Sequence, residues 1–199
     1  MKIIPSDEIE EIVSAEVSKD VNLVELQLQA NKMVKFAMSK GGVGLSGCQV
    51  DDFRKFFVWN QGRWNDQALA DYRIRQGMLK TPEADWDKVG LSGPTYIWKL
   101  VINPEYRPEK GGEVVSRESC LSYPGRAFVL KRHRKIWATY WIIQGNKLVR
   151  KSRTLTGYPA VIFQHETDHT NGITIKMIGV ELERKKKSEV PVKVEEKAS

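Results

Sequence analysis

Residues 164–169, Gln-His-Glu-Thr-Asp-His, constrain this chain more than any other stretch of its sequence. If the stretch is helical, His165 and His169 lie four residues apart and point from the same face. Two imidazoles placed in this way can share one metal ion, and Glu166 stands beside the first of them, within reach of a metal-bound water. The pattern is the His-Glu-x-x-His signature of metal-activated hydrolases. Taken alone, it also fits a solvated helix face that carries polar side chains.

Length and composition predict an ordinary globular protein. The 199 residues suit one domain, or one domain with extensions, and 41% of them are hydrophobic. No apolar run approaches the roughly 20 residues of a membrane helix, so we expect no membrane span. The first 30 residues carry seven acidic groups, so we expect neither a secretory nor a transit signal there. Two cysteines are too few for a disulfide framework, and we expect a reducing, cytoplasmic location.

The net charge of +7 is unevenly distributed. Residues 126–153 contain nine Lys or Arg and no acidic residue, and residues 184–187 add four basic residues in a row. One interpretation is a surface that faces a polyanion such as RNA or the ribosome. The other is a solubilising strand face followed by a frayed tail.

Two helices are expected in the N-terminal region. A first helix start is predicted at Ser6, with Ile9, Ile12 and Val13 at helical spacing. A longer helix is predicted from near Asp20 to the glycines at 41–42, because apolar residues recur there at steps of three and four. The residues of this stripe are Leu23, Leu26, Ala30, Val34 and Ala37.

Residues 42–49, Gly-Val-Gly-Leu-Ser-Gly-Cys-Gln, form a glycine-rich loop. They lack the third spaced glycine of a dinucleotide fingerprint and the Lys-Ser/Thr of a P-loop, so neither nucleotide site is expected. Exposed backbone groups there can instead pair with an extended peptide, as an added strand does. Gln49 supplies a neutral amide donor at the end of the loop.

The remaining pattern predicts strands followed by one helix, an α+β fold of mainly antiparallel strands packed around a C-terminal helix. The predicted strands are 56–59, 97–102 (stopped by Asn103-Pro104), 113–116, and a hairpin of 136–143 and 147–155 around Gly145-Asn146. The helix is predicted from Gly157-Tyr158-Pro159 to Asn171-Gly172, and residues 173–182 form a last strand or turn. Residues 60–93 are expected to be a long connection with a short helix at 68–75. We expect one catalytic domain, residues 1–183, with 60–93 as an insertion and 184–199 as a charged flexible tail.

A catalytic metal with two His ligands needs a third protein ligand. The residues alone leave His133, several carboxylates and the two cysteines as candidates. Cys120 follows a predicted strand, although a free cysteine is more often a small buried hydrophobe.

Three stretches together resemble the peptide deformylases. The family pattern is Gly-x-Gly-apolar-Ala-Ala-x-Gln, then Glu-Gly-Cys-Leu-Ser, then Gln-His-Glu-x-Asp-His. This chain has residues 42–49, Glu-Ser-Cys-Leu-Ser at 118–122 and residues 164–169 in that order, and the resemblance covers roughly residues 1–180. Ser46 and Gly47 replace the two alanines, and Ser119 replaces the glycine before the cysteine.

The resemblance implies a role for each of several residues. Cys120, as thiolate, would hold one divalent metal together with His165 and His169. Glu166 would take a proton from water and pass it to the leaving amine. The substrate would be the N-terminal formyl-methionine of nascent polypeptides, and formate would be released. The Gln49 amide and the Leu121 backbone N–H would stabilise the oxyanion.

Further residues are expected around this centre. Asp168 faces away from the metal and is predicted to anchor the site through Lys131 or Arg132. The predicted substrate-binding residues are Val43, Gly44, Ser119, Arg126, Tyr158, Val161 and Ile162. The last two and Tyr158 lie on the His165 face of the helix, where plain core packing explains Val161 and Tyr158 equally well.

The ligand types accept Zn²⁺ or Fe²⁺, and the resemblance implies Fe²⁺, with Zn²⁺, Ni²⁺ or Co²⁺ as substitutes. Two rival functions fit parts of the sequence. A His-Glu-x-x-His endopeptidase usually takes its third ligand downstream of the helix, but no histidine follows Gly172. A non-catalytic binding module would have no use for the whole set of catalytic residues.

Overall fold

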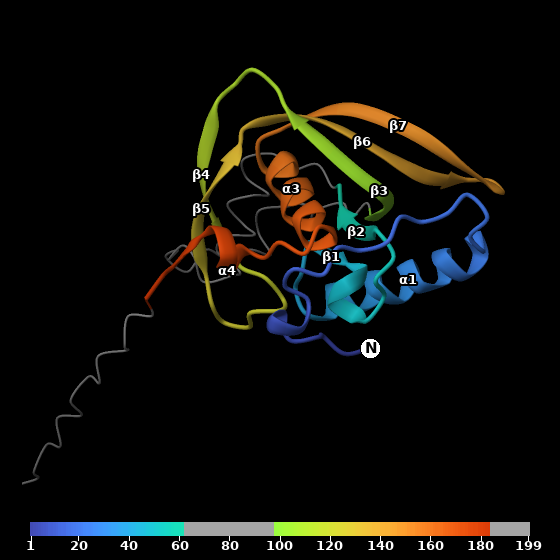
Figure 1. Ribbon diagram of the computed structural model, residues 1–199, viewed down its shortest axis with the longest axis horizontal. Helices are drawn as coiled ribbons and strands as arrows, with labels where there is room; N and C mark the ends of the chain where they lie inside the picture. Colours follow the sequence, from blue (N-terminus) through green and yellow to red (C-terminus); the bar gives the residue numbers. More distant parts are fainter. Residues whose placement is uncertain (62–97, 184–199) are drawn as a thin grey trace, which may run out of the picture.

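The computed structural model describes residues 1–61 and 98–183 of the chain. Most of the predicted connection at 60–93, the short helix expected at 68–75 and the predicted tail at 184–199 lie outside these residues. The described part is a mixed α/β structure with two antiparallel sheets (Figure 1), which confirms the predicted combination of helices with mainly antiparallel strands. Among the helices of these two ranges, none is long and apolar enough to cross a membrane.

The two sheets differ in size. The larger has the strand order β1-β2-β3-β6-β7, and the smaller has the order β4-β5-β8, with every described pair antiparallel. The strands are β1 (Gly44–Ser46), β2 (Phe56–Asn60), β3 (Trp98–Pro108), β4 (Glu113–Glu118), β5 (Phe128–His133), β6 (Lys135–Gln144), β7 (Lys147–Thr156) and β8 (Val180–Glu181). The helices are α1 (Leu23–Ser39), α3 (Tyr158–Thr170), the short α4 (Ile175–Ile178) and the 3-10 helices η1 (Ser6–Glu8) and η2 (Gly47–Val50).

Strand β2 forms the centre of the core because both of its faces are buried. Successive side chains of a strand point to opposite faces, so β2 contacts a different helix on each side. Phe56 and Val58 pack with the apolar stripe of α1. Phe57 and Trp59 pack with Phe163 of α3, their ring centroids 5.3 and 5.7 Å from that of Phe163. Helix α3 is thereby fixed on the larger sheet, and Figure 1 shows it between the two sheets.

Helix α3 begins and ends at the residues that the sequence predicted. Gly157, with a φ of 62°, precedes Tyr158, and Pro159 occupies the first turn, where its missing N–H costs nothing. Gly172 follows the helix with a φ of 74°. A side chain at Gly172 would also clash with the backbone of Glu11 and Ile12, so the N-terminal segment packs closely against the end of α3.

The N-terminal predictions were only partly correct. Ser6 starts a single 3-10 turn rather than a helix, because Ile9 is buried while Ile12 and Val13 are exposed. Helix α1 begins at Leu23, not near Asp20, because the Asn22 side chain caps it by accepting a hydrogen bond from the Glu25 N–H.

Strand β3 was predicted to stop at Asn103-Pro104. This was wrong, because the strand continues to Pro108. The register shifts between Ile102 and Glu105, which is a bulge, and Asn103 adopts a φ of 46° inside it. The Asn103 amide bonds the backbone N–H and C=O of Val17 at 2.8 and 3.0 Å, which stabilises this unusual conformation.

Strand β5 was not predicted, because basic residues interrupt the alternation of apolar and polar side chains that indicates a strand. Phe128, Leu130 and Arg132 are buried on one face of β5, and Arg132 is buried there through ion pairs. The neighbouring hairpin of β6 and β7 is confirmed, with Gly145 at a φ of 60° in the turn.

Candidate metal centre

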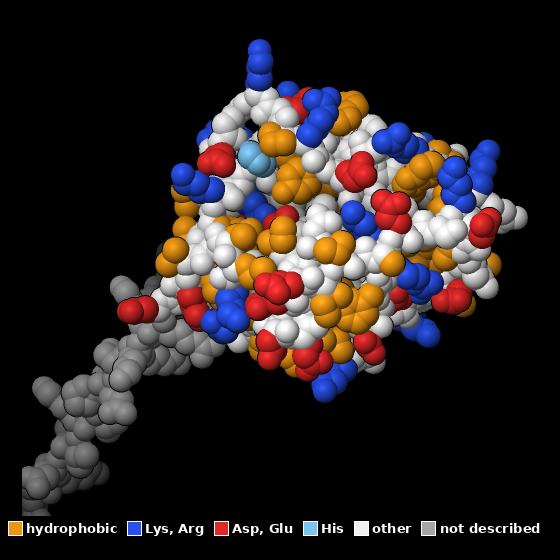
Figure 2. Space-filling view, in the orientation of Figure 1, with side chains coloured by type: hydrophobic (Ala, Val, Ile, Leu, Met, Phe, Trp, Pro, Cys, Tyr) orange, Lys and Arg blue, Asp and Glu red, His pale blue; other side chains and the backbone are white. Residues whose placement is uncertain are grey.

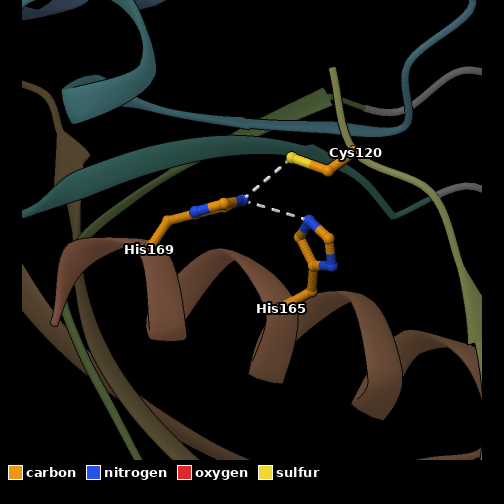
Figure 3. Close-up of side chains that lie close together, drawn as sticks. All are labelled: Cys120, His165 and His169. Atoms are coloured by element: carbon orange, nitrogen blue, oxygen red, sulfur yellow. Dashed lines mark hydrogen bonds between the residues drawn. The ribbon is translucent and has the colours of Figure 1, made fainter. Parts of the chain in front are cut away.

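Cys120, His165 and His169 bring three ligand atoms to one point (Figure 3). The two histidines extend from neighbouring turns of α3, and Cys120 lies just after β4. The His169 Nε2 atom is 3.2 Å from Cys120 Sγ and 3.2 Å from His165 Nε2. Ligand atoms around a tetrahedral zinc ion lie about 3.3–3.6 Å apart. Two of the three separations are close to these values and all three ligand atoms lie within 4.8 Å of one another, so the three side chains can converge on a single metal ion.

The charge states of these side chains favour metal binding. Burial alone would raise the pKa of the Cys120 thiol, but the nearby His169 and His165 outweigh it and lower that pKa well below its usual value of 9.0. The thiolate is the form that binds metals. The second cysteine, Cys48, differs, because burial and the nearby Glu166 and Cys120 raise its pKa to about 12. Its thiol donates to the backbone oxygen of His169.

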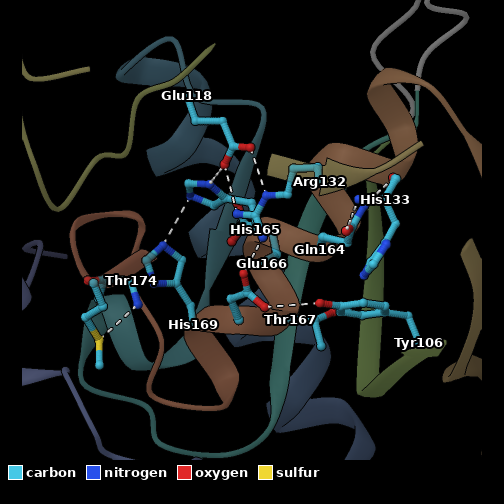
Figure 4. Close-up of polar contacts among 12 residues, drawn as sticks. Tyr106, Glu118, Arg132, His133, Gln164, His165, Glu166, Thr167, His169 and Thr174 are labelled. Atoms are coloured by element: carbon cyan, nitrogen blue, oxygen red, sulfur yellow. Dashed lines mark hydrogen bonds and ion pairs between the residues drawn. The ribbon is translucent and has the colours of Figure 1, made fainter. Parts of the chain in front are cut away.

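A buried ion-pair network binds Nδ1 of His165, the ring nitrogen that faces away from the other two potential ligands (Figure 4). Glu118 Oε2 lies 2.8 Å from His165 Nδ1, and the Arg132 guanidinium donates to both Glu118 oxygens at 2.9 Å. Arg132 also donates to Asp168. Of the two predicted partners of Asp168, Arg132 is the one that the structure shows. The other candidate, Lys131, pairs with Glu113, with its Nζ atom 3.9 Å from Glu113 Oε2.

The role of Glu118 was not predicted from the sequence. Its side chain is 6% exposed. Burial would raise the pKa of its carboxyl, but hydrogen bonds from His165 and Arg132 outweigh burial and lower that pKa to about 2. A carboxylate bonded to the far nitrogen of a histidine fixes the ring orientation and frees Nε2 for a metal. Glu118 was visible in the sequence two positions before Cys120, but nothing there indicated its partner.

Glu166 lies in a slot formed by β1. Its carboxylate packs against Gly44, where any added Cβ would come within 2.6 Å of the Glu166 Cδ atom. The Ser46 hydroxyl lies 2.8 Å from Glu166 Oε2. Burial raises the pKa of Glu166, against the opposing effect of His165 and His169. Only glycine leaves room for the carboxylate at position 44.

The Gln49 amide is held in one orientation. Its Oε1 accepts from the Ser46 backbone N–H at 2.9 Å, so its NH₂ group must point the other way. That group donates to Cys120 Sγ at 3.3 Å and to Ser122 Oγ at 3.0 Å. Gln49 therefore presents amide protons beside the three potential ligands.

One cavity of about 1480 Å³ joins these groups. His165, Glu166, Cys120, Gln49 and Leu121 line it. So do all the residues predicted to bind substrate: Val43, Gly44, Ser119, Arg126, Tyr158, Val161 and Ile162. His169 and Asp168 are buried behind the lining.

Three of the predicted substrate-binding residues also have structural contacts. Arg126 forms an ion pair with Glu181 of β8, with Nε 2.7 Å from Oε1. Ile162 and Tyr158 also pack with the aromatic cluster around Phe163. Core packing and cavity lining are therefore combined in these side chains.

The basic tract at 126–153 is not one continuous surface. Arg132 is buried, and Lys131 and Lys135 have acidic neighbours at 3.9 and 3.7 Å. The exposed basic residues of β7 are Lys147, Arg150, Lys151 and Arg153. Figure 2 shows Lys and Arg side chains over the outer end of the β6–β7 hairpin.

Comparison with known proteins identifies the family. Residues 6–185 match the family model described as polypeptide deformylase. A peptide deformylase of Thermotoga neapolitana is 27% identical over 150 residues, covering 75% of this chain and 70% of that protein. Peptide deformylase 1 of Streptomyces coelicolor is 35% identical over 162 residues, covering 81% of this chain and 61% of that protein.

A solved structure has the same fold. It is the class I type b peptide deformylase from Acinetobacter baumannii, in a crystal structure bound to Met-Ala-Ser. The similarity has a TM-score of 0.67 at 23% identity and covers 89% of this chain and 97% of that chain. The family match over residues 6–185 and the shared fold agree, and the chain belongs to the polypeptide deformylase family.

Proposed function

We propose that this protein is a metal-dependent hydrolase that removes the formyl group from the N-terminal methionine of nascent polypeptides and releases formate. The observation that carries the proposal is the convergence of Cys120, His165 and His169, together with a cavity that Cys120, His165 and Glu166 line. The family match over residues 6–185 supports it. An N-terminal formamide is the substrate class that this family hydrolyses.

The proposed cofactor is one divalent metal ion, Fe²⁺, with Zn²⁺, Ni²⁺ or Co²⁺ as substitutes. One thiolate and two imidazoles suit all four ions, and the donor atoms lie within 4.8 Å of one another. Such an ion, when bound, would supply Lewis acidity to water and to the formyl oxygen. Glu118 and Arg132 would hold His165 in the ligating tautomer.

In this proposal Glu166 is the general base and then the general acid. Its carboxylate lies one residue from a ligand and is buried, so it would accept a proton from water and pass it to the leaving amine. Gln49 Nε2 and the Leu121 backbone N–H would donate to the oxyanion that develops on the formyl oxygen. Gln49 is pre-oriented for this role by its bond to the Ser46 N–H.

The same cavity offers a place for the methionine side chain. Val43, Val161 and Ile162 would form an apolar slot, with Tyr158 and Ser119 beside it and Arg126 at the rim. Strand β1 is an edge strand of the larger sheet, and its Gly44 backbone would pair with the extended peptide.

We also propose that residues 1–183 form one catalytic unit that acts in the cytoplasm, and that basic residues of β7 or of the 184–199 tail assist ribosome association. Unpaired surface cations attract polyanions, and salt weakens the attraction. Deleting 184–199 should leave formate release intact but reduce co-sedimentation with ribosomes at low salt. Co-sedimentation unchanged after both this deletion and charge reversal on β7 would contradict the ribosome proposal.

Formate release from a formyl-Met-Ala-Ser peptide tests the proposed function. Anaerobically purified, metal-replete protein should release formate, and a chelator should stop the release until metal is restored. An acetyl-Met-Ala-Ser peptide serves as the matched control. Cleavage of an internal bond in an unformylated peptide, without formate release, would instead favour the rival endopeptidase activity.

A further inference from the structure

Ser46 lies between the proposed general base and the proposed oxyanion donor. Its side chain is fully buried, and it is not among the residues that line the cavity. The hydroxyl oxygen lies 2.8 Å from Glu166 Oε2 and 2.9 Å from the Glu166 backbone oxygen. Among the side chains of residues 1–61 and 98–183, Ser46 is the one that hydrogen-bonds to the Glu166 carboxylate.

The same residue fixes Gln49 through a capping box at the start of η2. The Gln49 backbone N–H donates to Ser46 Oγ, and Gln49 Oε1 accepts from the Ser46 N–H. The Ser46 oxygen therefore accepts one hydrogen bond from Gln49, which leaves its single proton for Glu166, whose Oε2 at 2.8 Å is charged and slightly nearer than its backbone oxygen at 2.9 Å. A chain of polar contacts thus runs from Gln49 through Ser46 to Glu166.

The neighbouring glycine leaves the carboxylate little freedom. Glu166 packs against the Cα of Gly44, where an added Cβ would overlap its carboxyl group. Gly44 limits the position of the carboxylate on one side, and the Ser46 hydroxyl attracts it on the other. A charge-assisted hydrogen bond of this kind is among the stronger ones in proteins.

We propose that Ser46 is a positioning residue, whose hydroxyl holds the Glu166 carboxylate in the orientation for proton transfer. This inference rests on the proposed deformylase function. Ser46 stands where the family pattern has alanine, so the hydroxyl is a feature of this chain rather than of the pattern. Because alanine is compatible with the fold at this position, Ser46→Ala removes the hydroxyl without adding bulk.

The test is the steady-state kinetics of Ser46→Ala on formyl-Met-Ala-Ser, with metal content and Tm measured on the same preparation. We expect kcat to fall about tenfold, the effect of losing one hydrogen bond to a charged group. KM should stay within about twofold and metal content should not change, because Ser46 does not itself line the cavity and is not one of the three potential ligands. Gly44→Ala, which displaces the same carboxylate by steric overlap, should also lower kcat with metal retained.

Ser14→Ala is the matched control. Ser14 is also buried, but its hydroxyl has no hydrogen-bond partner among the described residues, so its removal should leave kcat unchanged. A kcat for Ser46→Ala equal to that of the wild type would overturn the proposal, as would a fall that follows metal loss. If the metal-replete wild type releases no formate, the proposed deformylase function is contradicted, rather than the role of Ser46.

Discussion

Two buried side chains illustrate the chemistry at the scale of single residues. Burial raises the pKa of Glu166 and so favours its ability to hold a proton, while the adjacent histidines oppose this. The pKa of the Cys120 thiol is shifted in the opposite direction, because the neighbouring His169 and His165 lower it although burial would raise it. One cavity therefore contains a group that can carry a proton and a thiolate that can hold a metal.

Gln49→Leu should lower kcat by about 10²–10³, the usual effect of removing one oxyanion donor. Leucine keeps the size of the side chain but removes both amide protons that now contact Cys120 and Ser122. Formate release kinetics measure this effect, and metal content serves as the control. A variant with normal kcat would show that Gln49 does not act on the transition state.

The candidate site was easier to predict from sequence than the contacts that support it. His165, Glu166 and His169 follow from helical spacing, and the family pattern supplied Cys120 and Gln49. Glu118 and Ser46 could not be assigned roles, and Arg132 was only one of two candidate partners of Asp168, because these contacts join different elements. Such contacts depend on how elements pack, and one sequence does not contain that information.

At the scale of elements, Arg132 of β5 joins β4 and α3 by pairing with Glu118 and Asp168. Strands β3 and β5 differ from the sequence prediction, each because of one residue. Strand β3 continues through Asn103 because the amide of that residue bonds Val17, a contact distant in sequence. Strand β5 was missed because Arg132 occupies a core position that an apolar residue usually takes.

The Glu118 network should make the fold sensitive to acid. The pKa of Glu118 is about 2 in the folded protein and 4.5 for the free group, so its contribution is present above pH 4.5. That contribution is lost as the pH falls from 4.5 to 2, and it is on the order of 3 kcal/mol.

Chemical denaturation of the metal-free protein at several pH values checks this, with Glu118→Gln as the comparison. The wild type should be more stable than Glu118→Gln above pH 4.5, and this advantage should disappear near pH 2. An advantage independent of pH over this range would show that the carboxylate charge is not the cause.

At the scale of the whole molecule, the fold positions residues distant in sequence around one helix. Strand β2 anchors α3 on the larger sheet through Phe57 and Trp59, and Arg132 of the smaller sheet pairs with Asp168 on the same helix. Helix α3 therefore presents His165 and His169 to Cys120 from between two sheets. The central claim is that this arrangement holds a catalytic metal beside a proton-transferring carboxylate.

The most direct test compares Glu166→Gln with the wild type in paired measurements of bound metal and formate release. Glutamine keeps the size of the side chain but cannot accept the proton. We predict about one metal ion per chain in both proteins and a loss of at least about 10² in kcat for the variant. A Glu166→Gln protein that keeps its metal and releases formate at the wild-type rate would contradict the account.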